Sequence, residues 1–78
     1  MNALFTHEAS VPDSISDHLE QLDHCLTVPD LARILSIHKI TLYRMAAAGR
    51  IPSFKIATAV RFDPRAVAQW VREQAVSR

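Results

Sequence analysis

The stretch LARILSIHKITLYRMAAAGRIP, residues 31–52, decides the fold because its apolar spacing breaks twice. Apolar residues recur at helical intervals before and after a connection of about three residues that contains no glycine. The second segment ends at Gly49, a residue suited to the left-handed conformation that closes a helix. The stretch therefore predicts two short helices joined by a tight turn, followed by a change of direction at Gly-Arg-Ile-Pro.

The first helix has a clear start signal just before this stretch. Thr27 and Asp30 fit a capping box, in which the threonine oxygen accepts an early backbone N–H and the acid lies at the positive end of the helix dipole. We expect this helix over residues 28–36. The second is expected over residues 39–48, with His38 as a weak cap. Two short helices with a turn of this length indicate a helix-turn-helix.

The second helix has two chemically different faces. At about 100° per residue, Leu42 and Met45 point to one side, which is an ordinary core face. The other side carries two cations, a phenol, an isoleucine and an alanine, namely Lys39, Ile40, Tyr43, Arg44 and Ala47. A helix in the DNA major groove uses such groups, because cations bind guanine edges and phosphates, apolar groups contact thymine methyls and Tyr hydroxyls reach phosphates. A solvated helix with scattered apolar residues is the alternative.

A β-hairpin is predicted for residues 53–62, where the period of the sequence changes to two. With a short connection at residues 57–59, the apolar residues of the two strands lie on one side of the hairpin. These residues are Phe54, Ile56, Val60 and Phe62. Lys55 and Arg61 are then expected to face the other way.

A last helix is expected from Pro64 to about residue 75. Asp63 and Pro64 form a favourable pair for its start, since the acid can cap the helix and the proline needs no hydrogen-bond acceptor. Val67, Trp70 and Val71 form one apolar stripe along it, and Trp70 is expected to anchor the core.

Charge divides the 78 residues unevenly at Leu26. Residues 1–25 hold five acids and no Lys or Arg, whereas residues 26–78 hold nine bases and three acids, so the two parts carry −5 and +6. A compact basic part indicates a polyanionic partner such as nucleic acid, and ordinary solvated surface is the alternative. We therefore divide the chain into an acidic leader, residues 1–25, and a domain, residues 26–78.

The leader has one feature that predicts structure. Ile15, Leu19 and Leu22 share one side of a short amphipathic helix, and disorder is expected up to about Val11. The favoured role for the leader is electrostatic competition with phosphate for the basic part. The apolar stripe can instead be an oligomer or partner contact, or part of the core.

Other classes of protein are not favoured. The lone Cys25 excludes an intramolecular disulfide, and no apolar run approaches the 18 or so residues of a membrane span. His18, His24 and Cys25 lack the paired short spacings of a zinc site, so we expect no metal and no cofactor. So short a chain has little room for a catalytic cleft, so we expect no enzyme. The N-terminus lacks the features of a secretory signal, and the chain is interpreted as cytoplasmic.

Residues 26–72 resemble the excisionase-like, MerR-related winged helix-turn-helix DNA-binding domains. The segments LTVPDLARILSI, TLYRMAAAGRIP, FKI, VRF and VAQWV fall in register with the usual pattern of that family. The resemblance implies a mainly α fold with a small hairpin, in which the second helix enters the major groove and the hairpin forms a wing on the backbone or minor groove. It also implies a recombination directionality factor or a regulator of a mobile element, with double-stranded DNA and an integrase or recombinase as partners.

The resemblance assigns DNA contacts to the recognition helix, to the wing and to one helix N-terminus. These residues are Thr27, His38, Lys39, Thr41, Tyr43, Arg44, Lys55 and Arg61, and the outer face of the second helix adds Ile40 as a ninth predicted contact. The chain departs from the pattern in three places. Ser36 replaces the turn glycine, His38 replaces the turn serine, and the wing tip, residues 57–59, has no cation or glycine. We expect cooperative self-association on repeated sites, since one small domain reads few base pairs. A protein-interaction adaptor of the same fold is the alternative function, and salt dependence distinguishes the two.

Overall fold

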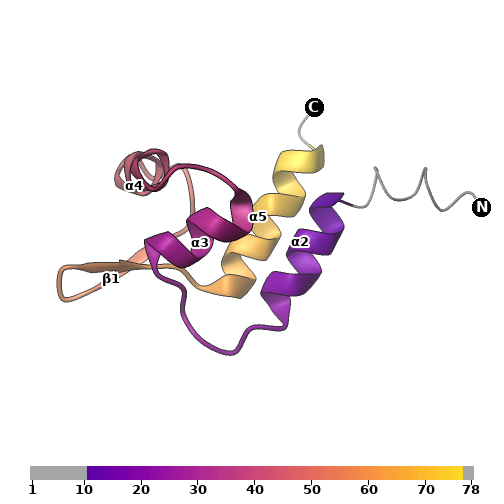
Figure 1. Ribbon diagram of the computed structural model, residues 1–78, viewed down its shortest axis with the longest axis horizontal. Helices are drawn as coiled ribbons and strands as arrows, with labels where there is room; N and C mark the ends of the chain where they lie inside the picture. The colour runs from indigo at the N-terminus through magenta and orange to yellow at the C-terminus, as the bar shows by residue number, and fades with distance from the viewer. Residues whose placement is uncertain (1–10, 77–78) are drawn as a thin grey trace, which may run out of the picture.

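The computed structural model describes residues 11–76, with side chains for residues 14–74. The disorder expected before Val11 lies outside the described residues. The elements are, in chain order, α2 (Val11–Glu20), α3 (Val28–Leu35), α4 (Lys39–Ala47), β1 (Phe54–Ile56), β2 (Ala59–Arg61) and α5 (Pro64–Val76). Figure 1 shows α4 and the hairpin on the left and α2 on the right, with α3 and α5 between them. This arrangement confirms the predicted winged helix-turn-helix fold, mainly α with a small hairpin.

Helix α3 begins with the predicted capping box. The backbone N–H of Asp30 donates to the Thr27 hydroxyl oxygen over 3.2 Å, and the backbone N–H of Thr27 donates to the Asp30 carboxylate over 3.3 Å. These bonds satisfy two of the N–H groups that a helix start leaves without partners. The backbone hydrogen bond from Thr27 also holds the pKa of Asp30 below its ordinary value. The start of α3 was thus predictable from local sequence.

Left-handed residues end both helices of the helix-turn-helix. Ser36 closes α3 at φ 58° and ψ 44°, and Gly49 follows α4 at φ 72°. The next backbone N–H in each case reaches back five residues, from Ile37 to the Ala32 oxygen and from Arg50 to the Met45 oxygen. This pattern is that of a Schellman cap. The left-handed residue of such a cap is most often glycine, because glycine has no Cβ to clash in that conformation. The prediction for Gly49 is confirmed, and Ser36 adopts the same conformation without that advantage.

The hairpin has a register that differs from the expected one. Its turn is Ala57–Thr58, and Ala59 already belongs to β2, where it pairs with Ile56. The expected connection was one residue longer, and a shift of one residue moves every side chain to the opposite face. The prediction that Lys55 and Arg61 share a face is therefore wrong, and so is the prediction that Val60 shares a face with Phe54 and Ile56. Lys55 pairs with Val60, whereas Arg61 pairs with Phe54 and lies on the other face.

The core lies where α2, α3, α4 and α5 meet the end of the hairpin. Phe62 is fully buried there, and it exchanges two backbone hydrogen bonds of 2.9 Å with Leu26. Leu31 of α3, Leu42 of α4 and Val67 of α5 are also fully buried. Because each helix contributes a side chain, the core fixes the position of α4 relative to the wing.

Helix α2 packs against α5, and the two lie side by side in Figure 1. Leu19 is fully buried, while Ile15 and Leu22 pack against the same core. The buried Ser16 hydroxyl donates to the Ala68 carbonyl oxygen over 3.3 Å. The apolar stripe of residues 15–22 was considered as an oligomer contact, a partner contact or part of the core. In the structure it is part of the core. Ile15, Leu19 and Leu22 therefore share one core with residues that follow Leu26.

Trp70 lies at the edge of this core and not at its centre. Its side chain is only partly buried, and its indole N–H donates to the Arg50 carbonyl oxygen over 2.9 Å. The prediction that Trp70 anchors the core therefore needs correction, since Phe62 occupies the centre. Trp70 instead ties α5 to the segment that leads from α4 to the wing. Among the helices described, none is long and apolar enough to cross a membrane.

Candidate nucleic-acid interface

Helix α4 presents the predicted outer face to solvent. Its buried side is formed by Leu42, which is fully buried, and by Met45 and Ala46, which are partly buried. On the opposite side, Ile40 is 63% exposed and Tyr43 is 51% exposed. The polar residues predicted as contacts on this helix and at its N-cap are all exposed, namely His38, Lys39, Thr41 and Arg44. The structure thus leaves five predicted contact residues of α4 and its N-cap residue accessible to solvent.

The segment of the chain that contains α4 carries charge of one sign. Residues 31–62, which include most of α3, all of α4 and the whole hairpin, contain six Lys and Arg residues and no Asp or Glu. Of these cations, Arg33 is paired with Asp30 over 3.0 Å, just before this segment. The remaining five are Lys39, Arg44, Arg50, Lys55 and Arg61. Such an acid-free region attracts a polyanion and raises its rate of association.

The wing contributes one clearly accessible cation. Lys55 is exposed on β1, whereas Arg61 is partly buried and its guanidinium donates to the Val60 carbonyl oxygen over 2.8 Å. Phe54 and Ile56, which share one side of β1, are 39% and 58% exposed. The wing surface therefore carries exposed apolar side chains beside its cation.

A hollow of about 380 Å³ lies between α4 and the hairpin. Tyr43 and Ala47 line it from α4, and Phe54, Lys55 and Val60 line it from the hairpin. Its walls therefore join α4 and the hairpin into one continuous surface, with an aromatic ring on each side and Lys55 among the lining residues.

Two of the predicted polar contacts lie at helix starts, and only one of their side chains has a local role in the structure. Thr27 is engaged in the capping box of α3, and its partner Asp30 carries a carboxylate that would repel a phosphate at this helix end. His38 is the N-cap residue of α4, but its side chain makes no capping hydrogen bond. The imidazole of His38 is therefore available for an outside contact, whereas Thr27 lies beside an acid.

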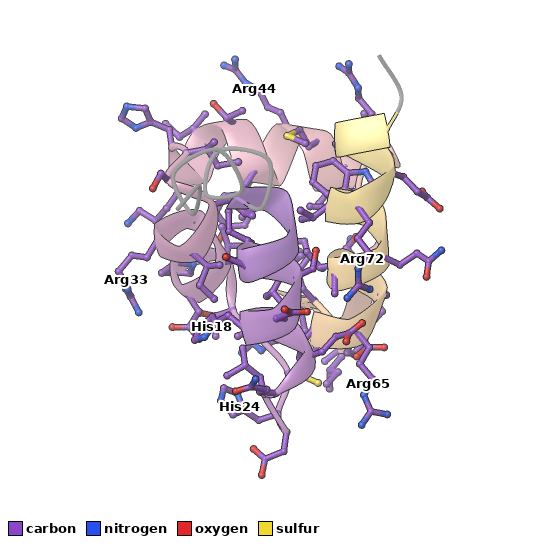
Figure 2. All side chains as sticks on the ribbon, turned by 90° about the vertical axis from the view of Figure 1, so that its right-hand side faces the viewer. His18, His24, Arg33, Arg44, Arg65 and Arg72 are labelled. Atoms are coloured by element: carbon purple, nitrogen blue, oxygen red, sulfur yellow. The ribbon has the colours of Figure 1, made fainter. Side chains whose placement is uncertain are left out.

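Two acids of α2, Asp17 and Glu20, lie beside α5. Arg72 of α5 pairs with Glu20 over 2.6 Å and contacts Asp17 over 3.7 Å. The hydrogen bond from Arg72 holds the pKa of Glu20 below its ordinary value. Figure 2 shows Arg72 beside α2 in the middle of the view and Arg44 at its top. These two carboxylates therefore neutralise the positive charge of Arg72 on α5. Their placement gives no support to competition with phosphate on α4.

Comparison with known proteins agrees with this geometry. A family model described as a helix-turn-helix domain matches residues 25–75, more than half of the chain. The chain belongs to this helix-turn-helix family. No curated protein and no solved structure matches it. A helix-turn-helix domain indicates DNA binding, and such domains are typically non-catalytic. Helix α2 precedes the region matched by the family model. It nevertheless packs against α5, which belongs to that region.

Sequence reasoning missed the exposed apolar side chains of the wing. Alternation in β1 correctly grouped Phe54 with Ile56, but it could not show whether that face is covered. The turn itself gave no signal, because Ala57 adopts φ 58° without being glycine or asparagine. The face that each wing residue occupies followed only from the observed register.

Proposed function

We infer that the protein binds duplex DNA in a sequence-specific manner, with α4 in the major groove and the hairpin as a wing on the backbone or minor groove. The observation that supports this most strongly is the exposed outer face of α4 within a region that holds six cations and no acid. The proposed contacts are His38, Lys39, Ile40, Thr41, Tyr43, Arg44, Lys55 and Arg61. We leave Thr27 out because the Asp30 carboxylate lies beside it.

Arg44 is the residue that best tests this function. It is exposed on α4, and a guanidinium can form two hydrogen bonds with a guanine edge. A site selected from random duplexes with the full chain provides the probe. Arg44→Ala should lower affinity for that duplex by about 1–3 kcal/mol, measured by fluorescence anisotropy.

Arg65→Ala is the matched control for Arg44→Ala. Both arginines are exposed and both substitutions remove one positive charge, but Arg65 lies on α5 near the bottom of Figure 2, far from Arg44. The control should change affinity much less. Equal losses for the two variants would show that total charge matters and that α4 is not the reading element.

The four exposed large apolar residues favour a second candidate, a protein-interaction adaptor. Ile40 and Tyr43 on α4, with Phe54 and Ile56 on the hairpin, form a surface that could bind an apolar partner such as an integrase. Binding to DNA through several phosphates should weaken steeply as salt rises, whereas an apolar protein contact should not. Titration of the duplex at two salt concentrations therefore separates the candidates.

The biological role that we propose is that of an excisionase-type recombination directionality factor or a regulator of a mobile element. The family is typical of excisionase-like proteins. We further propose that copies bind cooperatively to repeated sites, because one domain of this size contacts few base pairs. Footprinting of the DNA that flanks its own gene should show adjacent protected repeats. A single isolated protected site would contradict cooperative assembly.

A further inference from the structure

Ile40 occupies the most outward position of α4. At 100° per residue, it points opposite the buried Leu42 side of the helix, and it is 63% exposed, more than the other exposed large apolar residues described. Tyr43 and Arg44 lie one turn further along the same side. An isoleucine is stiff at χ1, so it loses little side-chain freedom when a partner covers it. The outer face of α4 thus has a preformed aliphatic contact at its centre.

The charges around Ile40 indicate what covers it. Lys39 and Arg44 on the same helix, and Lys55 on the wing, are exposed, and no acid lies within residues 31–62. A second copy of this face would bring like charges together, which is unfavourable. A polyanion complements the same charges. The occupant that fits both the cations and the aliphatic group is therefore duplex DNA.

The largest apolar group on the base edges of the major groove is the C5-methyl group of thymine. The other groups that distinguish the base pairs there are hydrogen-bond donors and acceptors. An isoleucine over a polar edge would remove water without replacing its hydrogen bonds, which is costly. Ile40 is the second residue of α4, and recognition helices contact base edges with their N-terminal residues. We propose that Ile40 reads the methyl group of a thymine, an inference that rests on the proposed DNA-binding function.

The spacing along α4 places this thymine relative to a guanine. Arg44 lies four residues after Ile40, which is about 6 Å along the helix axis. Successive base pairs are about 3.4 Å apart, so the two side chains address positions within about two base pairs of each other. The preferred site therefore contains a thymine within about two base pairs of the guanine that Arg44 contacts.

Deoxyuridine tests this assignment, since it differs from thymidine only by the C5-methyl group. Each thymine of a duplex selected from random sequence is replaced singly by deoxyuridine, and binding of the full chain is measured by anisotropy. One replacement should weaken binding by about fourfold, the value of one buried methyl group. Ile40→Ala should bind the thymine and deoxyuridine duplexes equally. At the same position, 5-methylcytosine should bind about fourfold more tightly than cytosine.

Ile56→Ala is the matched control, because Ile56 is also an exposed isoleucine but lies on the wing. Its ratio of thymine to deoxyuridine affinity should equal that of the unchanged protein. The assignment is overturned if no deoxyuridine replacement weakens binding, or if the methyl effect persists in Ile40→Ala. Either result leaves DNA binding itself intact, whereas failure to select any duplex would overturn the proposed function.

Discussion

The packing of α2 predicts that a substitution within this helix destabilises the whole domain. A leader that acted only through its charge would not have this effect. Leu19 is fully buried between α2 and the rest of the core. Leu19→Ala removes three buried carbon atoms, which at about 0.8 kcal/mol each lose about 2.4 kcal/mol of transfer free energy. The cavity left behind adds to this loss, so the total should be about 2–5 kcal/mol.

This loss is large compared with the stability expected for so small a protein. At about 0.05–0.15 kcal/mol per residue, a chain of 78 residues has a free energy of unfolding of roughly 4–12 kcal/mol. Leu19→Ala should therefore shift the urea midpoint strongly downward with little change in the slope. Trp70, the one tryptophan of the sequence, provides the fluorescence signal.

Gln21→Ala is the control for this experiment, since Gln21 is exposed just after α2. It should leave the midpoint nearly unchanged. If Leu19→Ala behaved like this control, α2 would not be part of the core. Where Leu19→Ala is still folded, its DNA affinity should equal that of the unchanged protein, because α2 lies away from α4 (Figure 1).

Two further outcomes are expected from local geometry. Ser36→Gly should raise the free energy of unfolding by about 1 kcal/mol, because glycine adopts the left-handed conformation of Ser36 without the cost of a Cβ; a lower urea midpoint would show that the serine side chain has a contact worth more than this strain. The stability should also decline as the pH falls below the ordinary Glu pKa of 4.5. The folded state lowers the pKa of Glu20 and of Asp30, so each ionised carboxylate stabilises the folded protein at higher pH. This stabilisation is lost as the carboxyl groups become protonated. Urea midpoints measured from pH 6 to pH 3 check this, and Glu20→Gln should show a smaller decline.

The sequence alone determined the elements that depend on neighbouring residues. The capping box of Thr27 and Asp30, the left-handed Gly49 and the Asp63–Pro64 start of α5 each involve groups within a few residues of one another. Their hydrogen bonds join groups that are close in the sequence, so residue types at fixed spacings indicate them. The outer face of α4 followed for a similar reason, because helical periodicity fixes which side chains lie opposite Leu42.

Tertiary structure decided the features that depend on distant segments. The partners of α2 are on α5, where Ser16 meets Ala68 and Glu20 meets Arg72, 52 residues apart in each case. Charge segregation could not reveal this, because the apolar stripe of α2 fits a core, a partner or a second copy equally well. The wing register was likewise set by a turn of two residues without a turn sequence. A single residue of register determines which face Lys55 and Arg61 occupy, and only pairing between whole strands fixes it.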